Sequence, residues 1–260
     1  MKKLFPYILL VSLVCLAYGN TLHHSFHFDD IPSILQKPWI RGLDKIPDFI
    51  FSYSQRPIVI LSFNVNYAIS GFKEWSYHVF NITFHLLVVV LVYRLGKLIV
   101  SHMSERSTSL VKVPTQMPLL AASIFAVHPL NTQAVTYISS RSSILATIFY
   151  LVTVILLFEG LYKKVDKETK TNYVFAVGAI ISFGIGFLCK LIVISLPAIL
   201  FAYHYYFISN DNLETWLKRQ RKWILGVGGL LFTTLLLKKI YGDGLLRASI
   251  VEVTTWDYFR

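Results

Sequence analysis

The sequence predicts an all-α fold, a polytopic bundle of about seven membrane-spanning helices. Of the 260 residues, 55% are hydrophobic and only 15% are charged, whereas a soluble domain carries roughly a quarter charged residues. Mean hydropathy is +0.56. Apolar segments of about 20 residues, the length that crosses a bilayer, recur along the chain. Lys and Arg gather in the short loops between these segments, as expected for a membrane protein.

The first apolar run, Leu4–Leu22, follows a basic start, Met1-Lys2-Lys3. One interpretation is a signal peptide, with Ala17-Tyr18-Gly19 near a cleavage position. The run is long for a signal peptide and lacks a clean cleavage motif of small residues. We therefore favour an uncleaved first span whose N-terminus is cytoplasmic.

Residues 23–76 are of mixed polarity and are interpreted as the first external loop. Within this loop, the stretch Ile58–Ile69 is apolar but interrupted by Asn64 and Asn66. It is too short and too polar to cross the membrane comfortably. We expect an amphipathic helix that lies in the interface on the extracytoplasmic side.

Six further spans are predicted after this loop. They cover residues 77–100, 117–127, 144–158, 173–188, 191–207 and 223–237, and a tail at 238–260 lies outside the membrane. The third is short, about 16 Å of helix, and His128-Pro129 disfavours its continuation. We interpret it and the fourth span as joined by a polar hairpin on the extracytoplasmic side. The basic loop expected at the end of the second span carries Arg94, Lys97, Arg106 and Lys112, which the positive-inside rule places in the cytoplasm.

Charge and cysteine content exclude other classes. The formal net charge of +11 would suggest nucleic acid in a soluble domain, but here the basic residues flank spans, so no nucleic-acid partner is expected. The two cysteines, Cys15 and Cys189, do not have the spacing of a disulfide framework, so a structural disulfide is not expected. The chain lacks heptads and repeats and is interpreted as one transmembrane domain, 1–260.

Two adjacent carboxylates, Asp29 and Asp30, follow the first span at the membrane edge. They could hold a metal, bind a basic partner, accept a proton from a substrate, or simply cap a short helix. The polar residues expected on the same side of the membrane are Asp29, Asp30, Arg56, His128, Arg141 and Lys190. This mixture suits a phosphate-bearing substrate and a proton to be removed, because Arg and Lys bind phosphate oxygens. The alternative for Arg141 is snorkelling at the interface.

The second span carries His78, Asn81 and His85 on one helical face. They are interpreted as an interhelical polar stripe, with metal ligation as the alternative. A divalent metal at the acidic pair is possible, although two carboxylates alone do not define a site. The chain contains neither a P-loop nor a dinucleotide fingerprint, so no motif indicates a soluble nucleotide donor.

Several motifs together resemble a known family. They are Phe28-Asp29-Asp30, Arg56-Pro57, Tyr77-His78 with Asn81 and His85, and His128-Pro129-Leu130-Asn131-Thr132-Gln133-Ala134-Val135 followed by Ser140-Arg141. The stretch from Leu4 to about Lys239 resembles the N-terminal membrane part of the transmembrane and tetratricopeptide-repeat O-mannosyltransferases and their bacterial relatives. These are glycosyltransferases of the GT-C class.

The resemblance implies transfer of a mannose-like sugar, with inversion, from a polyprenyl or dolichyl phosphate donor to a hydroxyl of a protein or glycan. The reaction is expected on the extracytoplasmic side of a bacterial inner membrane or the endoplasmic reticulum membrane. Asp29 and Asp30 are the implied catalytic pair. The donor phosphate is assigned to Arg56, Arg141, Lys190 and His128, and further polar lining to His78, Asn81, His85, Asn131 and Gln133.

Two departures from the family pattern keep other functions open. Relatives have an acidic residue where this chain has Leu191, and they continue through further spans, so the chain is expected to be the N-terminal portion of a larger module. The alternatives are a transporter or flippase for a lipid-linked sugar, and a non-catalytic membrane scaffold. Clustering of charges at the outer face disfavours a transporter, whose charged sites lie near mid-membrane.

Overall fold

The computed structural model describes residues 3–43, 56–106, 114–162, 170–207, 209, 211–222, 224–226, 228–229 and 232. Within these residues every regular element is helical, which confirms the all-α prediction. The chain divides into two compact units, Met1–Val193 and Ile194–Arg260. All the candidate site residues belong to the first unit.

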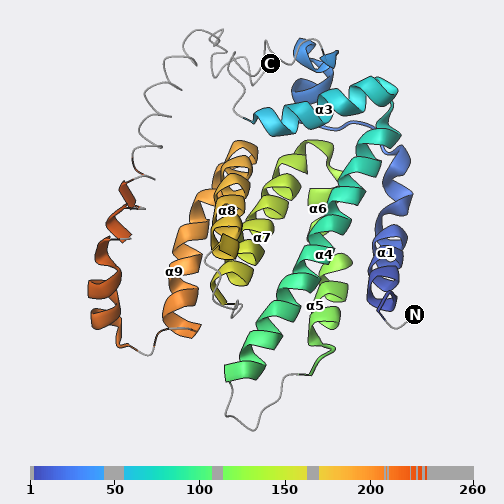
Figure 1. The fold of residues 1–260 in the computed structure, drawn as a ribbon. Coiled ribbons are helices and arrows are strands. Elements are labelled where there is room, and N and C mark those ends of the chain that lie inside the picture. The colour runs from blue at the N-terminus through green and yellow to red at the C-terminus, as the bar shows by residue number, and fades with distance from the viewer. Residues whose placement is uncertain are drawn as a thin grey trace, which may run out of the picture. The chain divides into compact units, whose positions relative to one another are not determined.

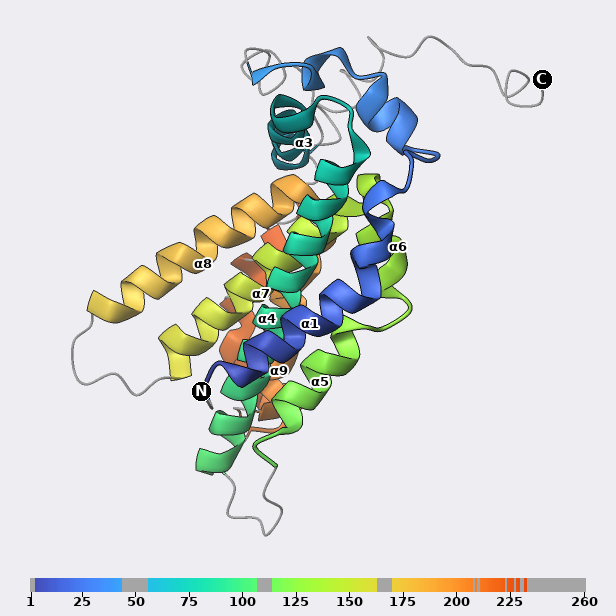
Figure 2. The ribbon, with the colours of Figure 1, turned by 90° about the vertical axis from the view of Figure 1, so that its right-hand side faces the viewer.

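The first unit is a helix bundle built around one long helix, α4 (Glu74–Arg106) (Figure 1). The helices α1 (Phe5–Tyr18), α5 (Met117–Ala126) and α7 (Arg141–Tyr162) pack against α4. The helix α8 (Lys170–Cys189) packs against α7 (Figure 2). Two clusters of buried apolar side chains fill the bundle, one centred on α4 and α7 and the other between α1, α4 and α5.

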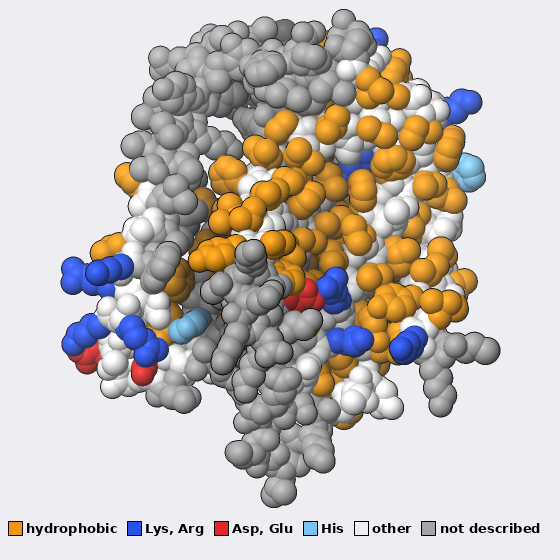
Figure 3. Space-filling model, in the orientation of Figure 1, with side chains coloured by type: hydrophobic (Ala, Val, Ile, Leu, Met, Phe, Trp, Pro, Cys, Tyr) orange, Lys and Arg blue, Asp and Glu red, His pale blue; other side chains and the backbone are white. Residues whose placement is uncertain are grey.

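Three helical segments among the described residues are long and apolar enough to cross a membrane, namely Phe5–His23, Glu74–Ser101 and Ile138–Gly160. Four apolar helices are shorter, namely Pro57–Ser70, Met117–Ala126, Tyr173–Cys189 and Leu191–Tyr206. Much of the surface shown in Figure 3 is hydrophobic, as a bilayer requires. The membrane class is confirmed, and the count of seven spans stays a prediction. Most of the predicted seventh span and the tail lie outside the described residues.

The second predicted span is longer than expected at both ends. The helix α4 begins three residues earlier and continues to Arg106, so Arg94 and Lys97 lie on the helix and not in a loop. Arg94 pairs with Glu159 of α7 at 2.6 Å. Since no proline interrupts this segment and Arg94 has a partner on the neighbouring helix, the basic end remains helical.

The predicted polar hairpin between the third and fourth spans is itself largely helical. The helix α5 ends at Ala126, just before His128-Pro129, as expected. A short helix α6 (Asn131–Thr136) and a 3₁₀ turn (Ile138–Ser140) follow, and α7 begins at Arg141. Asn131 Nδ2 donates to the carbonyl of Phe125 at 2.6 Å, which satisfies one of the free carbonyls at the end of α5.

The helix α3 (Pro57–Ser70) lies across the end of the bundle (Figures 1 and 2). Pro57 stands in its first turn, where a missing N–H costs nothing. Gly71 has a φ of 61° and ends the helix, which allows the chain to turn into α4. The apolar face of α3, including Val59 and Phe63, is buried against the first cluster. The prediction of a helix over Ile58–Ile69 is confirmed.

Between α1 and α3, the described residues of the connecting loop contain three short turns. They are a 3₁₀ turn at Gly19–His23, a π turn at Ile31–Leu35 and a 3₁₀ turn at Pro38–Ile40. Ile34 and Ile40 are fully buried and attach this loop to the first cluster. The loop therefore packs as a folded cap, although it contains no long helix over residues 24–43.

The second unit contains α9 (Leu196–Phe207), preceded by a 3₁₀ segment at Leu191–Ser195. The expected continuous span from Leu191 is thus broken. Pro197 lacks the N–H that a helix interior needs and restricts the backbone conformation of Leu196, the residue before it. A proline is tolerated in the first turn of a helix, and the α-helix accordingly begins at Leu196. Within this unit, Trp216 packs on Phe201 and Tyr205, and its indole N–H donates to His204 Nδ1 at 2.9 Å.

Candidate functional site

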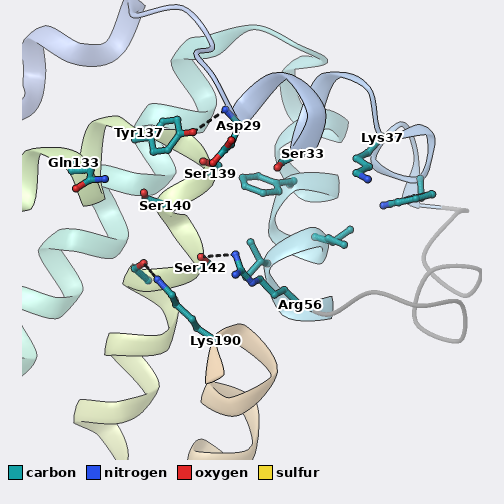
Figure 4. A pocket seen from close by; sticks show the side chains of 15 residues that line it. Asp29, Ser33, Lys37, Arg56, Gln133, Tyr137, Ser139, Ser140, Ser142 and Lys190 are labelled. Carbon is teal, nitrogen blue, oxygen red and sulfur yellow. Dashed lines mark hydrogen bonds between the residues drawn. The ribbon is translucent and has the colours of Figure 1, made fainter. Parts of the chain in front are cut away.

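A cavity of about 570 Å³ lies where the loop between α1 and α3, α3 itself and the start of α7 meet (Figure 4). Its volume is within the range of small-molecule sites, about 300–1,000 Å³. The lining residues are Asp29, Ser33, Lys37, Trp39, Arg56, Val59, Ile60, Phe63, Gln133, Tyr137, Ser139, Ser140, Ser142, Ser143 and Lys190. Three basic side chains, one carboxylate and five serines therefore share one cavity.

The two adjacent carboxylates have different surroundings. Asp29 is exposed and lines the cavity. Asp30 is only 1% exposed and is not a lining residue. Its carboxylate accepts hydrogen bonds from the N–H groups of Ser139, at 2.7 Å, and His27, at 3.1 Å. Asp30 therefore attaches the loop between α1 and α3 to the segment before α7, and of the two carboxylates only Asp29 faces the cavity.

A tight turn holds Asp29 at the cavity edge. Phe28 has a φ of 44°, which is rare for a bulky residue. The N–H of Asp30 donates to the carbonyl of His27 at 2.9 Å and closes the turn. The N–H of Asp29 donates to the hydroxyl of Tyr137 at 2.8 Å, as Figure 4 shows. These bonds leave the carboxylate of Asp29 directed to the cavity.

Two cations at the ends of different helices each donate a hydrogen bond to one of two neighbouring serines at the start of α7. Arg56, which precedes α3, donates through Nη1 to Ser142 Oγ at 3.3 Å. Lys190, which follows α8, donates through Nζ to Ser143 Oγ at 2.8 Å. Figure 4 shows both side chains on the same side of the cavity. Since Ser142 and Ser143 are adjacent, they bring two positive charges close together, an arrangement that suits an anion.

A third cation, Lys37, lies on the loop between α1 and α3. Its Nζ is 5.1 Å from the ring centroid of Trp39, which also lines the cavity. The backbone at Trp39 is fixed because its carbonyl accepts a hydrogen bond from Nδ2 of Asn64 at 2.9 Å. Asn64 is fully buried on α3. This wall of the cavity is therefore partly aromatic and partly basic.

Arg141 differs from both expectations for it. Its side chain is completely buried, so it does not snorkel at an interface, and it is not among the cavity-lining residues. Its guanidinium donates to Asn81 Oδ1 at 2.7 Å and to the carbonyl of Tyr77 at 3.0 Å. It also donates to the carbonyl and hydroxyl of Ser62, at 3.3 and 3.2 Å, and to Asn66 Oδ1. The sequence did not indicate this burial, because no carboxylate partner is nearby in the chain.

The polar residues of α4 form the interhelical stripe that the sequence predicts. His78 Nε2 donates to the carbonyl of His24 at 2.9 Å, and His85 Nε2 donates to that of Ala126 at 3.1 Å. Asn81 Nδ2 donates to the carbonyl of Val135 at 3.2 Å. All three α4 side chains are buried, and none lines the cavity. They connect α4 to the loop between α1 and α3, to α5 and to α6.

Of the remaining candidates, only Gln133 lines the cavity. His128 is exposed, and its Nδ1 accepts a hydrogen bond from the N–H of Leu130 at 3.3 Å. Among the described residues, no group of three His, Cys, Asp or Glu side chains is placed to hold a metal ion.

The sequence does not predict several residues of the site. Tyr137, Ser142 and Ser143 belong to the segment for which the sequence predicts only a polar hairpin. Asn64 and Asn66 were treated as interruptions of an apolar helix, yet both are fully buried and hydrogen-bonded. The available signal was the helical spacing of polar residues on α3: Ser62 and Asn66 are four residues apart and lie on the same face.

Comparison with known proteins confirms the family resemblance. The chain is 31% identical over 156 residues to the mouse protein O-mannosyl-transferase TMTC3, a region covering 55% of this chain and 16% of the relative. It is 32% identical over 163 residues to the Caenorhabditis elegans protein O-mannosyl-transferase F38B6.6, covering 57% of this chain and 22% of the relative. The chain thus spans about a sixth to a fifth of the length of these curated relatives. No family model matches the chain. No solved structure is similar to it.

Proposed function

We propose that this chain contains the donor site and catalytic base of a membrane glycosyltransferase. The enzyme moves a mannose-like sugar from a polyprenyl or dolichyl phosphate to a hydroxyl group of a protein. The acceptor class is suggested by the relatives, which are named protein O-mannosyl-transferases. The observation that supports the proposal best is one cavity in which Asp29 lies opposite the pair formed by Arg56 and Lys190.

Asp29 is the base in this mechanism. Its exposed carboxylate accepts the proton of the acceptor hydroxyl as that oxygen attacks the anomeric carbon of the sugar. A new carbon–oxygen bond forms, the bond between the anomeric carbon and the phosphate oxygen breaks, and its electron pair stays on the phosphate. Attack from the face opposite the leaving group inverts the anomeric configuration.

Arg56 and Lys190 stabilise the leaving group. The donor phosphodiester bears one negative charge, and the lipid phosphate that departs gains a second during the reaction. Two cations already held by Ser142 and Ser143 are oriented for this developing charge, so little reorganisation is needed in the transition state. The five serine hydroxyls of the cavity can provide further hydrogen bonds to phosphate or sugar oxygens.

The cavity faces the extracytoplasmic side of a bacterial inner membrane or of the endoplasmic reticulum. The helix α3, which borders the cavity, leads through Gly71 into the N-terminal end of α4, whereas Arg94 and Lys97 lie toward the C-terminal end of α4. Basic residues beside a span favour the cytoplasmic side, which leaves the opposite end of the bundle outside.

The test is sugar transfer by the full chain in liposomes, with radiolabelled polyprenyl-phosphate mannose as donor and a Ser/Thr-rich peptide as acceptor. Asp29→Asn is expected to reduce transfer about 10²-fold or more, because general base catalysis is lost. Binding of polyprenyl phosphate should remain, since Arg56 and Lys190 are intact. The matched control is Glu214→Gln, an exposed acid in the second unit, which should transfer like the parent. Full transfer by Asp29→Asn, or no transfer and no lipid binding by the parent, overturns the proposal.

A further inference from the structure

We propose that Arg141 is a positioning residue that clamps α3 onto α4 and α7, and so sets the relation between Arg56 and Lys190 at the donor site. The inference rests on the function proposed above for the role of that site. The clamp itself is a statement about helix packing that can be tested without sugar transfer.

The guanidinium joins three helices directly. Arg141 is the first residue of α7, and it makes five hydrogen bonds to four residues. Ser62 and Asn66 are one turn apart on α3, while Tyr77 and Asn81 are one turn apart on α4. A guanidinium has a rigid planar fork of N–H groups, so it fixes the acceptors relative to each other.

The acceptors are held in turn by their own donors. Asn66 Nδ2 donates to the carbonyl of Ser76 at 3.1 Å, and Asn81 Nδ2 donates to the carbonyl of Val135 on α6 at 3.2 Å. Asn66, Ser76 and Asn81 are all buried. The network thus extends from α3 through α4 to α6, and each amide uses both its oxygen and its nitrogen.

Arg141 is a buried charge whose hydrogen-bonding partners among the described residues are all neutral. Four aromatic rings surround the guanidinium: Phe63 at 4.4 Å, Tyr77 at 5.8 Å, Phe80 at 5.7 Å and Phe84 at 5.9 Å from ring centroid to Cζ. The buried Asp30 carboxylate acts on this charge through space, but it accepts none of the hydrogen bonds given above. Burying a charge is costly unless its donors are satisfied. The site therefore depends on the position of every acceptor, which is what a clamp requires.

The clamp adjoins the cavity through residues that line it. Phe63 lines the cavity and lies against the guanidinium. Ser142, the residue after Arg141, accepts the hydrogen bond from Arg56, and Ser143 accepts that from Lys190. Arg56 is at the start of α3, so a shift of α3 relative to α7 would move it away from Ser142. Arg141 thus acts on the donor site through α3 without lining the cavity.

The first measurement is a distance between α3 and α7. Nitroxide labels at Val65→Cys and Thr147→Cys, both exposed positions, are placed in a Cys15→Ser, Cys189→Ala background. Pulsed electron paramagnetic resonance should give one narrow distribution of distances between the two labels in the parent. Arg141→Met and Asn66→Leu should each broaden or shift it, and Arg141→Lys should do so too, because an ammonium keeps the charge but loses the fork. The control is Thr153→Val, a change at a buried position of α7 outside the network, which should leave the distance distribution unchanged.

The second measurement is the KM for polyprenyl-phosphate mannose. Arg141→Met and Asn66→Leu should each raise it about tenfold, and the double variant should be no worse than Arg141→Met alone, because both remove one coupled unit. If the parent neither transfers sugar nor binds polyprenyl phosphate, the proposed function fails while the distance measurement still decides on the clamp.

Three outcomes overturn the clamp. The first is a parent-like distance and KM for Asn66→Leu, and the second is additivity of the two changes in KM. The third is full retention of both properties by Arg141→Lys, which would mean that only the charge of residue 141 matters. Should Arg141→Met not yield a monodisperse protein, Asn66→Leu and Arg141→Lys provide the same test.

Discussion

Asp29 and Asp30 show how strongly the environment separates two neighbouring side chains of the same type. The turn at Phe28 directs Asp29 to the cavity, while Asp30 is buried and accepts two backbone hydrogen bonds. Asp30 is a poor candidate for accepting a substrate proton, because its carboxylate is buried, does not line the cavity and has both oxygens engaged by backbone N–H groups. An exposed carboxylate at the edge of a cavity can accept one.

Asp30→Asn is expected to destabilise the protein. The amide retains one oxygen, but its NH₂ group must face a backbone N–H that previously donated to the carboxylate, which leaves a buried donor unsatisfied. The cost is about 1–3 kcal/mol, and it should appear as a lower midpoint of thermal unfolding in detergent.

Asp29→Asn is the control for that measurement. Because Asp29 is exposed, this variant should unfold at the parent's midpoint. If Asp30→Asn instead unfolded like the parent and lost all transfer, Asp30 would be the base, and the assignment of Asp29 would be wrong.

At the scale of elements, close approach between helices determines the bundle. The helices α7 and α8 meet at Gly160, where an added Cβ would lie 2.8 Å from Cβ of Phe175. Small residues at such contacts allow helices in membranes to pack closely.

Gly160→Ala is expected to lower stability by about 1–3 kcal/mol, because overpacking forces the helices apart. The matched variant is Gly184→Ala on α8, where nothing lies within 4 Å of the added Cβ. That change should be neutral or slightly stabilising, since alanine is the better helix former. Thermal unfolding of both variants in one detergent checks the pair; equal midpoints would show that the α7–α8 contact tolerates the extra methyl group.

At the scale of the whole molecule, the proposed orientation in the membrane can be tested at the two ends of α4. A membrane-impermeant maleimide added to intact cells should label Gln36→Cys, which is exposed on the loop between α1 and α3. It should label Ser101→Cys, exposed near the opposite end of α4, only after permeabilisation. Both are made in a Cys15→Ser background. Labelling with the opposite preference would place the cavity in the cytoplasm and exclude the extracytoplasmic reaction.

The similarity to curated O-mannosyl-transferases concerns just over half of this chain and about a sixth to a fifth of those proteins. The cavity nevertheless lies entirely within the first unit, Met1–Val193. The proposed chemistry can therefore be tested on residues that this chain itself provides.

The sequence by itself determined the all-α membrane class, the helix over α3, the end of α5 before His128-Pro129 and the family resemblance. These features depend on composition, periodicity and proline, which act over a few neighbouring residues. Only the tertiary structure decided that Asp29 faces the cavity and Asp30 does not, and that Arg141 is buried among Asn66, Asn81 and four aromatic rings. The bond between Asp30 and Ser139 joins residues 109 positions apart. No local pattern specifies such a contact, because it exists only once the loop, α3 and α7 pack together.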